Sequence, residues 1–175
     1  SSEFERLNAA PGVFVYRRPY TNRVLHFNHA AYPTNDLRFR KALAVGLDHE
    51  AIALTAAGGL EDAINLQPSY FNEDSPVYGV DPECEALFGV NDPEQGKALL
   101  AEMGYNGEEV TLLSQATSGS TYNYMVAMAD QMEKQLGITV NFLTMDWPTT
   151  LAAAQKEEGW HIFPSGYTST PLFDV

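Results

Sequence analysis

Residues 110–145 read VTLLSQATSGSTYNYMVAMADQMEKQLGITVNFLTM and decide the fold. Two runs of aliphatic and β-branched residues, Val110–Leu113 and Ile138–Met145, have the composition of buried strands. Between them, Thr121–Leu136 carries apolar residues at helical spacing and is closed by Gly137. A strand, a helix and a second strand in this order predict parallel strands joined by a right-handed crossover.

The same alternation continues toward the end of the sequence. Asp146, Trp147 and Pro148 begin a helix that extends to Lys156, and Trp160–Phe163 forms a third strand. We therefore expect an α/β fold whose mixed sheet contains a βαβαβ unit with flanking helices. Ligands of such sheets bind beyond the carboxyl ends of the strands. Those ends are residues 114–120, 145–147 and 165–170.

Aspartates mark the helix starts upstream of this unit. Asp36, with Thr34 and Asn35 before it, offers N-cap oxygens to a helix over residues 37–47. Asp48 begins a second short helix that ends at residues 58–59, both glycine. Asp92 is followed by a proline and a glutamate, and this third helix ends at the glycine at position 104.

Two other segments are less regular. Residues 13–16 and 24–28 are expected to form two strands joined by a turn, because β-branched and aromatic residues cluster around Pro19 and Asn22. Residues 60–91 contain several prolines and glycines and predict an irregular surface segment with one helical turn at residues 83–88.

Composition limits the classes of function. A chain of 175 residues with 45% hydrophobic residues fits a single domain. The net charge of -13 opposes binding to nucleic acid. No stretch approaches the roughly 18 apolar residues of a membrane span, and no export signal begins the sequence. Cys84 is alone and is interpreted as a small apolar filler.

Four stretches together resemble the family 5 extracellular solute-binding proteins, the periplasmic peptide/nickel/opine-binding class. They are residues 11–28, beginning PGV and ending LHFN; residues 36–52, DLRFRKALAVGLDHEAI; residues 92–105, DPEQGKALLAEMGY; and residues 136–140, LGITV. The resemblance implies a bilobal clamp with the type II periplasmic-binding-protein-like fold, similar to domain 3 of the dipeptide-binding protein. The chain is then expected to be most of the inserted second lobe, without the first lobe and the signal peptide of its parent.

The same resemblance implies a function. The parent protein would be the solute-binding component of an ABC importer in a bacterial periplasm or other extracytoplasmic space. It would be a monomer without a cofactor, and it would deliver a peptide, an opine or a sugar-like solute to a membrane permease.

The family pattern also points to site residues after the third strand. Family peptide binders hold the ligand amine with an aspartate in a Gly-Trp-Xaa-Xaa-Asp-like stretch, and this chain has residues 166–170, GYTST. Tyr167 matches the aromatic wall of the pocket, and Thr168 and Ser169 follow it. Thr170 stands where the aspartate is expected, and a hydroxyl cannot supply the charge-assisted hydrogen bond, worth roughly 1.5 to 3 kcal/mol.

The loop after the first parallel strand lacks the arginine that anchors the ligand carboxylate in dipeptide binders of the family. Dipeptide binders place an arginine there, whereas residues 115–120 contain no cation. Gln115 and Ser118 are ligand candidates, with an ordinary strand-to-helix loop as the equal alternative. A neutral, hydroxyl-rich ligand is then as well supported as a peptide.

Two further candidates have structural alternatives. Trp147 could stack on a ligand, although an aromatic before a helix-starting proline more often packs on the next turn. Asn28 could bind a ligand with its amide, although satisfying nearby backbone is the more frequent role. His26 and His29 would lie on opposite faces of a strand, so no metal site is expected.

Two other classes of function remain open from the residues. A small α/β enzyme could use the same strand ends, but no nucleophile with a base, phosphate loop or metalloprotease helix is recognisable. A receptor or sensor domain could use the same lobe for contact with a partner.

Overall fold

The computed structural model describes residues 6–15, 21–71, 73, 75–116 and 119–168. Its centre is a four-stranded mixed sheet of β1 (Thr21–Phe27), β2 (Val110–Gln115), β3 (Val140–Met145) and β4 (Ile162–Thr168), in the order β1-β4-β2-β3. β2 pairs in parallel with β3 and with β4, as the alternation of strands and helices predicts. β1 pairs with β4 in the antiparallel direction.

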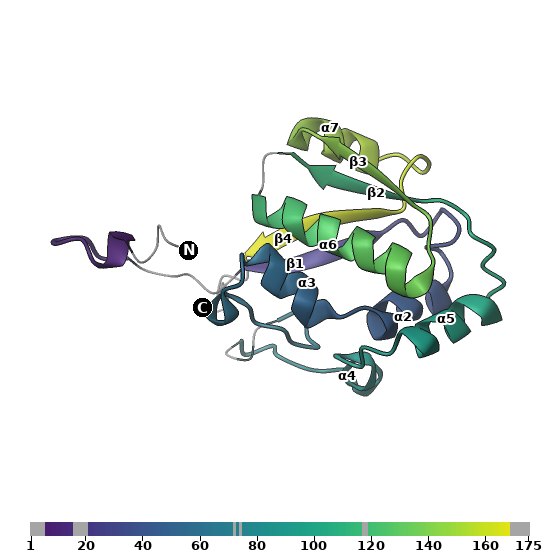
Figure 1. Cartoon of the computed structure of the whole chain (residues 1–175), viewed down its shortest axis with the longest axis horizontal. Helices are drawn as coiled ribbons and strands as arrows, with labels where there is room; N and C mark the ends of the chain where they lie inside the picture. Colours follow the sequence, from purple (N-terminus) through teal and green to yellow (C-terminus); the bar gives the residue numbers. More distant parts are fainter. Residues whose placement is uncertain (1–5, 16–20, 72, 74, 117–118, 169–175) are drawn as a thin grey trace.

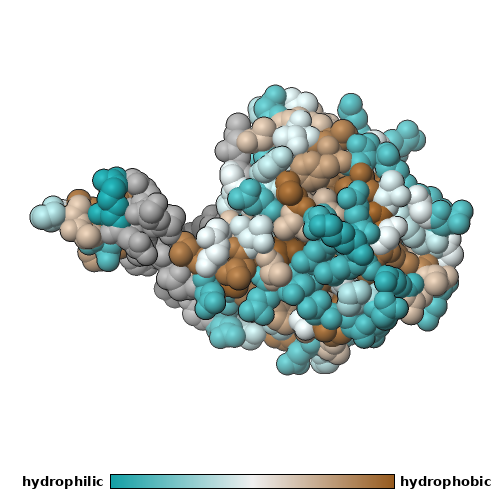
Figure 2. Space-filling view, viewed as in Figure 1, coloured by the Kyte–Doolittle hydropathy of each residue, from teal (hydrophilic) through white to brown (hydrophobic). Residues whose placement is uncertain are grey.

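Helices cover the two faces of the sheet (Figure 1). α6 (Gly119–Leu136) packs on one face through three methionines, Met125, Met128 and Met132, which are almost fully buried. α7 (Trp147–Ala154) covers β2 on the other face. α2 (Leu37–Gly46), α3 (His49–Ala56) and α5 (Pro93–Glu102) pack around α6 and complete the main core. Figure 2 shows many hydrophilic residues over the middle of the face on which α6 lies.

Aspartate caps begin the helices that the sequence predicts. Asp36, Asp48, Asp92 and Asp146 each accept a hydrogen bond from a backbone N–H in the first turn of α2, α3, α5 and α7. These bonds satisfy amide groups that have no partner inside the helix. Residues 60–91 are largely irregular, as expected, with a short 3-10 helix, η1 (Glu61–Ala63), and α4 (Pro82–Leu87).

α2 and α5 approach each other at a pair of glycines. A Cβ atom added to Gly96 would lie 3.0 Å from the Cα atom of Gly46 and 3.1 Å from the carbonyl oxygen of Ala42. Leu136 of α6 closes the same contact from a third side. The two helices can pack this closely because neither glycine carries a side chain at the crossing.

Two predicted features differ in the structure. The expected strand at residues 13–16 is wrong for the described part. Residues 13–15 form no strand there, and Phe14 is 89% exposed. Tyr16 lies outside the described residues. The last strand starts two residues later than predicted and extends to Thr168. Residues 165–168 are therefore strand and not loop, because pairing with β1 satisfies their backbone.

Within the described residues, no helix combines the length and hydropathy needed to cross a membrane.

Candidate functional site

The carboxyl ends of the parallel strands meet at one edge of the sheet, here called the carboxyl edge. β2 ends at Gln115, β3 ends at Met145 and β4 ends at Thr168. Because β1 is antiparallel to β4, its first residues belong to the same edge, with Thr21 opposite Thr168. Residues from four strands and from the start of α6 therefore gather where parallel sheets bind ligands.

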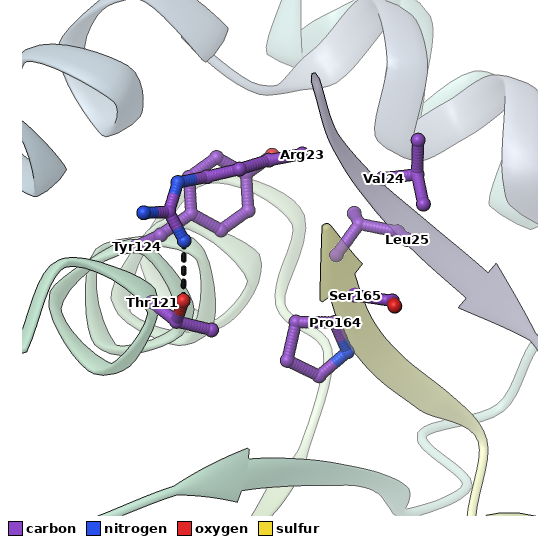
Figure 3. Close-up of a pocket in the computed structure, with 7 residues that line it drawn as sticks. All are labelled: Arg23, Val24, Leu25, Thr121, Tyr124, Pro164 and Ser165. Carbon is purple, nitrogen blue, oxygen red and sulfur yellow. Dashed lines mark hydrogen bonds between the residues drawn. The ribbon is translucent and has the colours of Figure 1, made fainter. Parts of the chain in front are cut away.

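A small open pocket lies at this edge, between β1, β4 and α6 (Figure 3). Its empty volume is about 230 Å³, including space open to solvent. Its lining residues are Arg23, Val24, Leu25, Thr121, Tyr124, Pro164 and Ser165. Leu25 and Pro164 give the pocket an apolar floor, whereas Arg23 and Thr121 supply polar groups at its mouth.

Arg23 joins the start of β1 to the start of α6. One Nη atom donates to the hydroxyl of Thr121, and the other donates to the hydroxyl of Ser120 at 2.5 Å. Surrounding protein lowers the pKa of Arg23, because desolvation disfavours the charged form. A guanidinium nevertheless stays charged at physiological pH. The two hydroxyls fix the orientation of this cation without neutralising it.

Tyr124, a residue of α6, lies beside the side chain of Arg23. Burial raises the pKa of its phenol, and the charge of Arg23 opposes that shift. The phenol is therefore neutral at physiological pH, so it does not neutralise the guanidinium either.

Some of the residues predicted from the sequence belong to the carboxyl edge. Tyr167 and Thr168 lie in β4, where their backbones pair with Asn22 and Thr21; the structure does not describe their side chains. Ser118, Ser169 and Thr170 lie outside the described residues. Gln115 is the last residue of β2 and is partly buried.

Trp147 lies at the same edge but on the other face of the sheet. It is the first residue of α7, and its ring stacks on Phe163 with centroids 5.8 Å apart and an interplanar angle of 25°. Phe163 points away from the face of Pro164, because successive residues of a strand alternate. Trp147 remains 36% exposed, so the residue packs on its own fold while one part of it stays accessible.

Asn28 lies at the opposite edge of the sheet. Its amide nitrogen donates to the carbonyl oxygens of Glu157 at 2.9 Å and Trp160 at 3.0 Å, and its amide oxygen accepts from the N–H of Ala30. Asn28 is 5% exposed. Asn28 therefore has the structural role considered for it from the sequence, and the fold does not bring it to the carboxyl edge.

Arg23 is the residue that sequence reasoning missed. The expected cation was sought in the loop after β2, whereas Arg23 reaches the start of α6 from a strand far earlier in the chain. The signal that could have found it is the antiparallel pairing of β1 with β4, which the sequence does not specify.

Residues 2–174 match the profile of the bacterial extracellular solute-binding proteins, family 5, in its middle part. The chain belongs to this family. Members of family 5 are solute-binding proteins, and the fold described above is shared with them.

Curated relatives within family 5 come from several bacteria. The chain is 26% identical over 157 residues to the probable peptide ABC transporter periplasmic-binding protein y4tO of Sinorhizobium fredii, a match that covers 83% of this chain and 28% of the relative. It is 28% identical over 159 residues to the periplasmic oligopeptide-binding protein OppA of Salmonella typhimurium, covering 84% and 29%. The chain therefore spans less than a third of the length of these relatives.

Solved structures share the fold. AgaA of A. tumefaciens R10, solved in complex with agropinic acid, is 27% identical with a TM-score of 0.75, over 95% of this chain and 33% of AgaA. The murein tripeptide-binding protein MppA of Escherichia coli is 23% identical with a TM-score of 0.76, over 95% and 32%. The likeness to MppA concerns the fold alone.

Proposed function

We propose that the chain is most of the second lobe of a periplasmic or other extracytoplasmic solute-binding protein that serves an ABC importer. The lobe captures a small solute together with a first lobe, and the closed protein delivers it to a membrane permease. The observation that carries this proposal is the family 5 match over residues 2–174. The relatives y4tO and OppA, a probable peptide ABC transporter periplasmic-binding protein and a periplasmic oligopeptide-binding protein, support the same role.

The solute is a peptide, an opine or a sugar-like molecule. The curated relatives support a peptide, and AgaA with agropinic acid supports an opine-type ligand. The contacts are proposed to come from the carboxyl edge: Tyr167, Thr168, Ser169, Thr170, Gln115, Ser118 and Trp147.

The chain binds its solute without converting it, and it acts as a monomer without affinity for nucleic acid. Membership in a family of solute-binding proteins supports binding as the whole activity. The net charge of -13 supports the absence of nucleic acid as a partner. Closure of two lobes over the carboxyl edge would be a hinge motion.

Thermal-shift measurements on the full-length product of the gene test this proposal. The panel contains dipeptides and tripeptides, opines, oligosaccharides and glutathione. One class of solute should raise the melting temperature of the protein. The rise should grow with the solute concentration, since a ligand at 100 times its Kd stabilises the folded protein by about 2.7 kcal/mol. Mass spectrometry should recover that solute unchanged, and cells without the gene should lose its uptake.

Three results would contradict the proposal. If no solute of the panel changes the melting temperature, the binding role fails. A converted solute would indicate an enzyme. Tight binding with normal uptake in cells without the gene would instead favour a sensor.

A further inference from the structure

The pocket at the carboxyl edge holds a cation without an acidic partner in the described part of the chain. The Nη atoms of Arg23 donate to Ser120 and Thr121, both neutral hydroxyls. The ion pairs of the described residues use other bases, such as Arg38 with Asp36 and Lys41 with Glu83. A guanidinium in a partly desolvated pocket gains most from an anion.

Arg23 also has unused donor capacity. A guanidinium carries five N–H groups in one plane, and Ser120 and Thr121 accept from two of them. Within the described residues, the remaining three have no acceptor. The planar fork of such a group matches the two oxygens of a carboxylate. The hydroxyls of Ser120 and Thr121 hold the fork in place, so less side-chain entropy is lost when an anion binds.

The position of Arg23 fits a ligand contact. In the register of β1 and β4, Arg23 lies opposite Gly166, next to the pair that contains Tyr167. The pocket beside the guanidinium has an apolar floor formed by Leu25 and Pro164 (Figure 3). A solute with an apolar part and a carboxylate would place its apolar part against Leu25 and Pro164 and its carboxylate against the guanidinium of Arg23.

The overall charge of the chain makes nonspecific attraction of anions a poor explanation. A net charge of -13 repels an anionic solute at long range. Salt at moderate concentration screens that repulsion beyond about 10 Å. It does not screen a direct contact between a carboxylate and the guanidinium of Arg23 to the same extent. An acidic solute would therefore be retained by a local contact.

We propose that Arg23 binds the carboxylate of the solute and makes the site selective for acids, such as free peptides and opines, over neutral sugars. The proposal rests on the solute-binding function proposed above and narrows its ligand class. It replaces the expectation, drawn from the cation-free loop after β2, that a neutral ligand is equally supported.

Matched pairs of probes test the proposal on the unaltered full-length protein. Calorimetry compares alanyl-alanine with its C-terminal amide, and octopine with its dimethyl ester; glutathione and maltotriose complete the set. At least one free acid should bind, and blocking its carboxyl groups should weaken binding roughly 10- to 100-fold. Because this comparison needs no substitution, it holds even if a variant does not fold.

Substitution then assigns the effect to one side chain. Arg23→Gln should weaken binding of the free acid by the same factor as blocking the carboxyl group does. It should bind the blocked analogue with the affinity of the unaltered protein, because the substitution and the blocking group remove the same contact. Arg23→Lys should recover only part of the affinity, since an ammonium lacks the fork. Arg38→Gln, which removes a guanidinium paired with Asp36 near the opposite edge of the sheet, should leave affinity unchanged.

The outcomes separate this proposal from the function itself. If no probe binds and the wider solute panel also fails, the proposed function is wrong and the role of Arg23 falls with it. Three other results would overturn the role of Arg23 alone: equal binding of a free acid and its blocked analogue, normal binding of the acid by Arg23→Gln, or binding of maltotriose only. In each case the protein remains a solute-binding protein, but Arg23 is not its contact with a carboxylate.

Discussion

The backbone N–H of Thr111 donates a hydrogen bond to the Nδ1 atom of His161 at 2.8 Å, so a side chain takes a place in the hydrogen-bond ladder between β2 and β4. The backbone N–H of His161 donates in return to the carbonyl oxygen of Thr111 at 2.9 Å. Because Nδ1 accepts, the ring hydrogen is on Nε2, which lies 3.0 Å from the carbonyl oxygen of Tyr32. The neutral ring therefore joins three segments just before β4 begins.

Stability should depend on pH through His161. Burial lowers its pKa from the usual 6.5, against weaker opposing effects of the Tyr32 carbonyl and the Glu109 charge. Between the lowered pKa and 6.5 the unfolded chain binds the extra proton, so stability is complete above 6.5 and is lost as pH falls through that window. Urea unfolding at pH 7.5 and at lower pH measures this loss.

His161→Asn provides the control for that titration, because an amide oxygen can accept from Thr111 but does not titrate in this range. Its stability should change less over the same pH interval than that of the unaltered chain. Equal pH dependence in both proteins would mean that other groups cause the loss.

Gly96→Ala should destabilise the chain. The added methyl would meet backbone atoms, the Cα of Gly46 at 3.0 Å and the carbonyl oxygen of Ala42 at 3.1 Å, which cannot rotate away. Overpacking costs about 1 to 3 kcal/mol, which exceeds the gain of about 1 kcal/mol in helix propensity. Gly79→Ala is the matched control, since nothing lies within 4 Å of its Cβ position. If both variants have the same urea midpoint, the close crossing of α2 and α5 is not needed.

Removing a buried hydroxyl should have different effects on stability at two positions. Thr34 is fully buried and its hydroxyl donates to the carbonyl oxygen of Asn28 at 2.7 Å, so Thr34→Val should cost about 1 kcal/mol. The hydroxyl of Ser114 is buried without a partner in the described part of the chain, so Ser114→Ala should change stability by less than about 0.5 kcal/mol or increase it. Chemical denaturation of both variants checks the contrast, and a large loss for Ser114→Ala would indicate a partner outside the described residues.

The carboxyl group of Asp36 should titrate near pH 2. Arg38 holds its pKa at about 2, below the usual 3.8, through hydrogen bonds from its side chain and from its backbone N–H. Arg38→Gln should raise that pKa toward 3.8, whereas the lowered pKa of Asp146, which depends on Thr149, should not move. Carbon-detected NMR titration resolves both groups, and an unchanged Asp36 would show that the N-cap bond alone sets its pKa.

Local signals in the sequence predicted most of the helices. An N-cap aspartate acts within three residues, so Asp36, Asp48, Asp92 and Asp146 could be recognised without knowing the tertiary fold. The parallel βαβ units followed from the same kind of local evidence, because a helix between two strands leaves few ways to connect them.

The features that the sequence did not predict depend on contacts between distant segments. β4 continues through Pro164 and Gly166 because β1 supplies its partner, and neither residue favours a strand by itself. For the same reason, Arg23 could not be assigned to the start of α6. Residues 13–15 have strand-forming side chains, yet they form no strand. Strand propensity takes effect through a paired neighbour, and no strand of the described residues pairs with them.

The pairing of β1 with β4 also has a consequence for how the protein is made. In the described sheet β1 has no neighbour other than β4, and Thr21 pairs with Thr168, a residue far later in the sequence. During synthesis β1 cannot pair until the residues through Thr168 have left the ribosome, and closing so long a loop is slow. The pocket that Arg23 shares with Pro164 is therefore assembled late, and substitutions that weaken β4 should lower the yield of folded protein before they change its affinity.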